Sequence, residues 1–72
     1  MPSLGVAAAA GVATARKNIE RKLRRKGAIS SETAVKPEEA EITAKHELGW
    51  LNRLIEHGNV GRTEDDKVWW KG

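Results

Sequence analysis

The chain has 72 residues, a net charge of +3 at pH 7, no cysteine, and three tryptophans as its only aromatic residues. A chain of this length forms one domain and buries only about 60% of its unfolded surface, so a catalytic cleft between two lobes is not expected. Without cysteine, neither a disulfide nor a thiolate metal site can stabilise the core, which suits a cytoplasmic protein.

Residues 1–11 (MPSLGVAAAAG) are apolar, but they are too few to span a bilayer, which needs about 20 residues. A signal peptide is disfavoured because no positive charge precedes the apolar run, and alanine drives insertion only weakly. The end of a longer membrane helix is a further, less favoured alternative, suggested by the bases that follow. We expect a flexible tail over residues 1–11 and no membrane partner.

Residues 12–26 are expected to form the first helix, and Gly27 is expected to end it. The apolar residues recur at the spacing of one helical face: Val12, Ala15, Ile19 and Leu23. The other faces carry seven bases against one acid, Glu20; the bases are Arg16, Lys17, Arg21, Lys22, Arg24, Arg25 and Lys26. These bases form either a phosphate-contacting surface or a solvated face that keeps a small protein soluble, and the two interpretations are equally favoured.

The segment 28–43 carries the signatures of several short elements. Residues 28–30 have the composition of a short strand. Ser30 or Ser31 can cap a short helix over residues 32–35, and Pro37 can open a further turn. Thr43 can cap the helix that follows.

Residues 44–57 predict an amphipathic helix that ends at Gly58. Its apolar face consists of Ala44, Leu48, Leu51 and Ile55, widened by Trp50 and Leu54. Residues 60–63 and 67–70 are rich in β-formers and flank the polar turn 64–66. The sequence therefore predicts a C-terminal β-hairpin.

This order of elements resembles the winged helix-turn-helix family, above all its small archaeal and bacterial members. The resemblance is carried by residues 27–35 (GAISSETAV) and 51–63 (LNRLIEHGNVGRT). It implies an α+β domain over residues 12–72 with three helices, with or without a short extra turn, and a small antiparallel sheet ending in a hairpin wing. The fold serves DNA binding, RNA binding and protein contacts alike.

The family role implies a transcriptional regulator or accessory factor that places the helix 44–57 in the major groove of DNA. The basic helix 12–26 would contact phosphates, and DNA is favoured over RNA. The residues expected to contact nucleic acid are Lys45, His46, Asn52, Arg53, Arg16, Lys17, Arg21, Arg24, Arg25 and Arg62. Asn52 and Arg53 suit adenine and guanine edges. Glu47 and Glu56 on the same helix would repel phosphates, and all these positions could also be ordinary surface residues.

The wing departs from the family pattern, because its tip is Glu64-Asp65-Asp66 and would be repelled by a phosphate backbone. Trp69 and Trp70 are neighbours on a strand, so they face opposite sides and one is expected to stay partly exposed. Trp69 is therefore a candidate interface residue, unless it packs under the basic helix or against the tail. The alternative function is a protein-interaction module, a homodimer through the wing strand or first helix, or a ribosome- or RNA-associated protein.

An enzymatic function is not expected. His46 and His57 lie eleven positions apart, about 16 Å along a helix, which is too far for joint metal ligation. The glycines form no phosphate-binding loop, and neither Ser30 nor Ser31 has an identifiable base. We therefore expect no catalytic residue, no cofactor and no metal.

Overall fold

A computed structural model describes residues 4–72 of the chain, with side chains from Thr14 onward. The elements follow in the order α1 (Leu4–Arg25), the 3-10 helix η1 (Pro37–Ala40), α2 (Lys45–Glu56), β1 (Val60–Arg62) and β2 (Val68–Trp70). The described residues form an α+β fold with two α-helices and one two-stranded antiparallel sheet.

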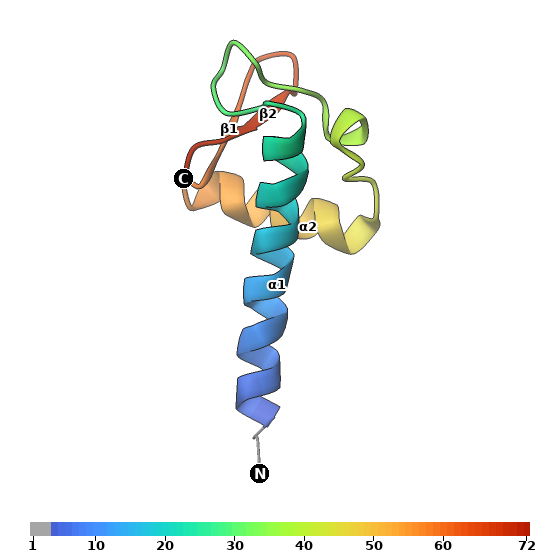
Figure 1. Ribbon diagram of the computed structural model, residues 1–72, viewed down its shortest axis with the longest axis vertical. Helices are drawn as coiled ribbons and strands as arrows, with labels where there is room; N and C mark the ends of the chain where they lie inside the picture. Colours follow the sequence, from blue (N-terminus) through green and yellow to red (C-terminus); the bar gives the residue numbers. More distant parts are fainter. Residues whose placement is uncertain (1–3) are drawn as a thin grey trace.

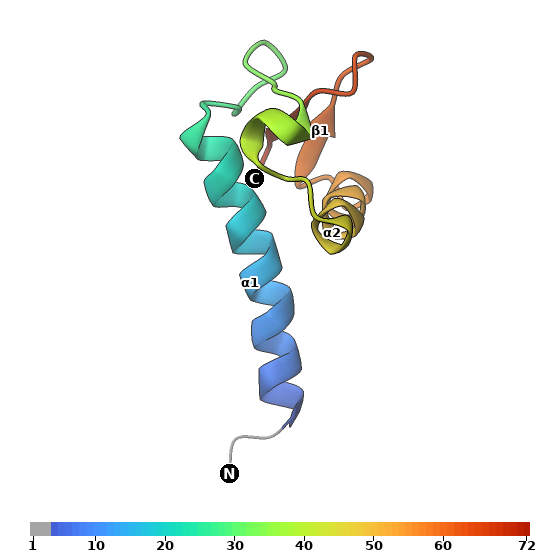
Figure 2. The same ribbon diagram turned by 90° about the vertical axis from the view of Figure 1, so that its right-hand side faces the viewer.

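The N-terminal part of α1 extends away from the compact part of the molecule, as Figure 1 shows. α2 crosses α1 on one side, and the hairpin of β1 and β2 lies above α2 (Figure 2). The molecule measures 46 × 21 × 21 Å along its principal axes. α1 thus supplies the length, and everything after it packs against its C-terminal part.

The core lies where α1, α2 and the hairpin meet. α1 contributes Ile19 and Leu23, both fully buried, and α2 contributes Leu51 and Leu54. The other buried apolar residues come from the connecting segment and the hairpin: Ala28, Ala40, Ile42, Val60, Val68 and Trp70. The predicted apolar face of the first helix is therefore confirmed at Ile19 and Leu23, and Ala15 is half-buried.

α1 starts earlier than the sequence indicated. Its backbone is helical from Leu4, whereas the expected start was Val12. The expected flexibility of residues 1–11 stays a prediction, and residues 1–3 lie outside the described residues. The predicted end is confirmed, because α1 ends at Arg25 and Gly27 takes the left-handed conformation (φ +72°) that favours glycine.

The expected helix over residues 32–35 is not formed, so the prediction of three helices is wrong in this segment. The Thr33 hydroxyl accepts hydrogen bonds from the backbone N–H groups of Ile29 and Ser30, both at 3.1 Å. These bonds fold the chain into a turn. Val35 then pairs with Val68 of β2 as an isolated antiparallel bridge. The expected strand 28–30 is reduced to one contact, in which Trp70 N–H donates to the Ala28 carbonyl at 2.8 Å.

The turn expected at Pro37 is η1, and Glu41 in the left-handed region (φ 62°) ends it. The N-cap of α2 is Ala44, without a side-chain cap hydrogen bond, so the expected cap at Thr43 is wrong. The apolar side of α2 is centred on Leu51 and Leu54, whereas Leu48 is 37% exposed.

The predicted hairpin is present. β1 pairs with β2 in the register Val60–Trp70, Gly61–Trp69 and Arg62–Val68. Gly58 has a φ of +84° and turns the chain from α2 into β1, as expected of a residue after a helix end. Trp70 is buried in the core and Trp69 lies on the opposite face, partly exposed.

Candidate nucleic-acid interface

The exposed side of α2 carries most of the residues that the sequence assigned to base reading. Because Leu51 and Leu54 face the core, the residues on the far side of this helix are open to solvent. Lys45, His46, Asn52 and Arg53 are all exposed. The structure therefore places these four side chains on one helix surface.

An open hollow lies beside this surface, between α2 and α1. It is lined by Arg16, Trp50, Arg53, Leu54, His57 and Asn59. The Arg53 guanidinium carbon lies 5.4 Å from the centre of the Trp50 ring, a cation–π geometry. The residues that line it combine a tryptophan and a leucine with two arginines and a histidine, and none of them is acidic. This chemistry suits a phosphate or another anion with an aromatic neighbour.

A second, shallower hollow lies on the other flank of the same pair and is lined by His46, Gly49, Trp50 and Arg53. The stack of Arg53 on Trp50 therefore separates two hollows on the α2 surface. We use the name α2 surface for Arg16, Lys45, His46, Asn52 and Arg53, with the hollows between them.

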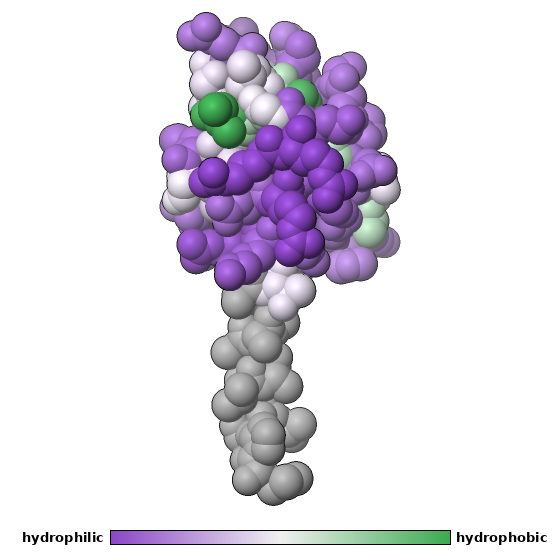
Figure 3. All heavy atoms as spheres, in the orientation of Figure 1, coloured by the Kyte–Doolittle hydropathy of each residue, from purple (hydrophilic) through white to green (hydrophobic). Residues whose placement is uncertain are grey.

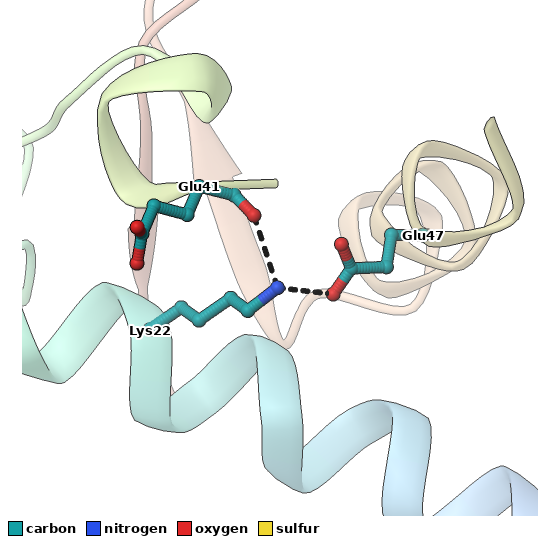
Figure 4. Close-up of polar contacts among 3 residues, drawn as sticks. All are labelled: Lys22, Glu41 and Glu47. Carbon is teal, nitrogen blue, oxygen red and sulfur yellow. Dashed lines mark hydrogen bonds and ion pairs between the residues drawn. The ribbon is translucent and has the colours of Figure 1, made fainter. Parts of the chain in front are cut away.

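Lys22 links α1 to α2 and does not belong to either exposed basic group. Its Nζ lies 2.6 Å from Glu47 Oε2 and donates to the Glu41 carbonyl oxygen at 3.0 Å (Figure 4). The Lys22 side chain is 27% exposed and that of Glu47 is 18% exposed. The negative charge of Glu47, expected to repel phosphates, is thus compensated at close range by α1.

The remaining bases of α1 form a separate group. Lys17, Arg21, Arg24 and Arg25 line a shallow depression along this helix, together with Glu20. Glu20 forms an ion pair with Arg24, with 2.9 Å between Nε and Oε2. Figure 3 shows a strongly hydrophilic face over α1 in the compact part of the molecule. We call these four bases the outer α1 surface.

The two surfaces do not face the same way. Successive helix residues are turned by about 100°, so Arg21, two positions from both Ile19 and Leu23, points away from the core. Arg16 lies three positions before Ile19, on the flank of α1 that meets α2. Figure 2 shows α1 and α2 on opposite sides of the molecule. The structure therefore brings Arg16 to the same hollow as Arg53 of α2. The other four bases, Lys17, Arg21, Arg24 and Arg25, lie apart from it.

The hairpin contributes little positive charge. Arg62 is exposed on β1, but the tip residues Glu64, Asp65 and Asp66 are exposed as well. Asp65 and Asp66 line a hollow with Lys36, Pro37 and Glu38 of the η1 region. An acidic surface therefore covers the tip of the hairpin and the neighbouring η1. Trp69, the candidate interface residue, covers Gly61 of β1, because a Cβ added to Gly61 would overlap its ring.

His57 and Asn59 in the first hollow were not among the expected site residues. The contact between Trp50 and Arg53 could have been found, because residues three apart are neighbours on a helix. No local sequence pattern indicates that Arg16 and His57 line the same hollow, because this depends on how α1 crosses α2.

No family model, no curated protein and no solved structure matches the chain. Among the residues that the structure describes, no group of His, Cys, Asp or Glu side chains could hold a metal ion. In the same part of the chain, none of the helices combines the length with the apolar character that crossing a membrane requires.

Proposed function

We propose that the protein binds nucleic acid, with DNA as the favoured form, through a reduced winged helix-turn-helix domain. The order of elements supports this proposal: a first helix, a segment that pairs with the hairpin at Val35, the short turn η1, the long helix α2 and the hairpin. In this assignment η1 takes the place of the second helix, α2 is the recognition helix and the hairpin is the wing. The role would be that of a transcriptional regulator or accessory factor.

The observation that carries the proposal is the convergence of Arg16, Arg53 and His57 around Trp50, beside α2. Arg16 comes from α1 and Arg53 from α2, so arginines of two different elements line one hollow that has no acidic residue in its lining. Like charges brought together repel each other, and a bound phosphate would offset that cost. The ion pair of Lys22 with Glu47 supports the same conclusion, because it compensates the negative charge of an acidic residue of α2.

The members of the α2 surface suit different contacts. Asn52 is exposed and has the amide that recognises adenine edges, and Arg53 can reach a guanine edge or a phosphate. The Trp50 ring restrains the Arg53 guanidinium, which reduces the side-chain entropy lost on binding. Arg16 and Lys45 suit contacts to phosphates that flank the bases read by α2. The acidic wing tip favours an approach in which the wing stays away from the duplex.

The test is a titration of a mixed-sequence DNA duplex at several salt concentrations, with Arg16→Gln/Arg53→Gln as the variant. We expect the variant to lose about tenfold or more in affinity, and the slope of log K against log salt to fall by about one to two units. The matched control is Lys26→Gln/Lys36→Gln, which removes two exposed bases outside both surfaces. The control should weaken binding less and leave the slope unchanged.

Equal losses in the variant and the control would show that only net charge matters, and would contradict a site at the α2 surface. A complete lack of duplex binding at low salt would contradict the proposed function itself, because non-specific binding is strongest there. The alternative function, a protein-interaction module, is supported by the acidic surface of Glu38, Asp65 and Asp66, which suits a basic partner.

A further inference from the structure

We propose that the outer α1 surface is a second nucleic-acid-binding surface, so that one molecule bridges two duplex segments. Only the bridging part rests on the proposed function, because it needs the α2 surface to hold the first duplex. Binding at the outer α1 surface itself depends on Lys17, Arg21, Arg24 and Arg25 alone.

The first argument is the placement of the two surfaces. Ile19 and Leu23 are fully buried, and Arg21 projects about 160° away from each of them around the helix axis. The compact part of the molecule is 21 Å across, and it lies between the outer α1 surface and the exposed side of α2. A straight duplex seated on the α2 surface therefore does not reach Arg21 or Arg25.

The second argument is the charge of the outer α1 surface. Among the ion pairs of the described residues, Arg24 with Glu20 is the one that involves this surface. Lys22, the base that could have joined it, is directed toward α2. Lys17, Arg21 and Arg25 follow each other at four-residue spacing, and like charges at this spacing destabilise a helix. A polyanion offsets that repulsion.

The third argument is the match in length. From Lys17 to Arg25 the helix rises about 12 Å. One strand of a duplex presents a phosphate every 3.4 Å or so along the axis, so this length faces about three or four phosphates. Three of the four bases are arginines, whose planar guanidinium groups bind phosphate through two hydrogen bonds. The surface thus fits a short stretch of one strand without reading its sequence.

An anionic membrane is the less suitable partner. A basic helix that lies on a membrane inserts its apolar side between the lipids. The apolar side of the described part of α1, at Ile19 and Leu23, is buried in the core and is not free to insert. Among the side chains that the structure describes, the surface offers charge without an apolar anchor, as a phosphate backbone requires.

The experiment uses two duplexes of the same mixed sequence, one attached to beads and one carrying a fluorophore, with the full-length protein added. We expect the wild-type protein to retain the fluorescent duplex on the beads at low salt. Lys17→Gln/Arg21→Gln/Arg25→Gln should bind a single duplex through the α2 surface, yet retain about tenfold less fluorescence. Glutamine is a good helix former, so α1 should be preserved, which circular dichroism checks. The control Lys26→Gln/Lys36→Gln should retain several-fold more of the fluorescent duplex than the triple variant does.

Several outcomes would overturn the proposal. Wild-type protein that binds one duplex but retains no second one would refute bridging and leave the proposed function standing. Retention by the triple variant equal to that of the wild type would mean that bridging arises elsewhere, for example through two copies of the chain. A third outcome concerns vesicles with about 30% phosphatidylserine. If they bind the wild type but not the triple variant, and no bridging of duplexes is seen, then lipid is the partner. Loss of all duplex binding in the wild type would refute the proposed function as well.

Discussion

Lys22 shows how one side chain can change the charge that a neighbouring helix presents. In the sequence it is one of seven basic residues between positions 16 and 26, and nothing distinguishes it from Lys17 or Lys26. In the structure its ammonium group lies between the Glu47 carboxylate and the Glu41 carbonyl oxygen, and so it holds α1, η1 and α2 together. A charge-assisted hydrogen bond in a partly buried position contributes more than an exposed ion pair.

Lys22→Met should lower the free energy of unfolding by about 1–2 kcal/mol, because the partly buried Glu47 loses its partner. It should also weaken duplex binding, because α2 then carries one uncompensated negative charge. Lys26→Met is the matched control, since Lys26 is exposed and forms no ion pair among the described residues. Its effect on stability should stay within about 0.5 kcal/mol. Urea unfolding followed by tryptophan fluorescence measures both, and equal effects would show that the ion pair does not form in solution.

At the scale of the elements, most of what the local pattern dictates is confirmed. The long helix was expected over 44–57 and is Lys45–Glu56, and the hairpin follows at the expected place. Glycine after each helix supplies the left-handed turn, at Gly27 and Gly58. These features depend on residues close in sequence, which explains why the pattern sufficed.

The segment 28–35 is where the pattern failed. Its serines and Glu32 suit a helix start, but a tertiary contact decides the outcome. Val35 exchanges two backbone hydrogen bonds with Val68, at 3.0 and 2.7 Å, and this requires an extended chain. Lys36, which precedes Pro37, is extended as well (φ −71°, ψ 147°). Val35 is β-branched and lies beside this pre-proline position, and both features favour an extended chain. Pairing with β2 then outweighs the weak helix preference of the segment.

The hairpin depends on the absence of a side chain at Gly61. A Cβ there would overlap the Trp69 ring, so Gly61→Ala should displace Trp69 and lower the free energy of unfolding by about 1–3 kcal/mol. Gly49→Ala is the matched control, because a Cβ there meets nothing within 4 Å and the position is helical. This control should stabilise the protein by about 0.5–1 kcal/mol. Destabilisation of equal size in both variants would show that Trp69 does not rest on Gly61.

At the scale of the whole molecule, charge is divided into three regions that composition does not reveal. The α2 surface and the outer α1 surface are basic, and the tip of the hairpin with η1 is acidic. Arg16 and Lys17 are neighbours in sequence, yet Arg16 faces α2 and Lys17 belongs to the outer α1 surface. The sequence identified the basic helix and the acidic tip, but which bases act together depends on how α1 crosses α2. That crossing is set by long-range packing of Ile19 and Leu23, which no local pattern encodes.

The acidic region leads to a prediction about how the molecule is oriented on nucleic acid. Glu64→Gln/Asp65→Asn/Asp66→Asn raises the net charge by three units from +3. If the wing stays away from the duplex, the variant should bind several-fold more tightly at low salt through long-range attraction alone. The slope of log K against log salt should then stay unchanged, because no further phosphate is contacted.

The matched control is Glu32→Gln/Glu38→Gln/Glu39→Gln, which makes the same change in net charge at three exposed acids before and within η1. Both variants should gain affinity to a similar extent, since at a distance only the total charge matters. A larger gain for the wing variant, together with a steeper salt slope, would mean that the neutralised tip now meets phosphates. In that case the carboxylates of the tip keep the wild-type wing off the duplex by repulsion at close range. The wing would then lie beside the α2 surface in the complex.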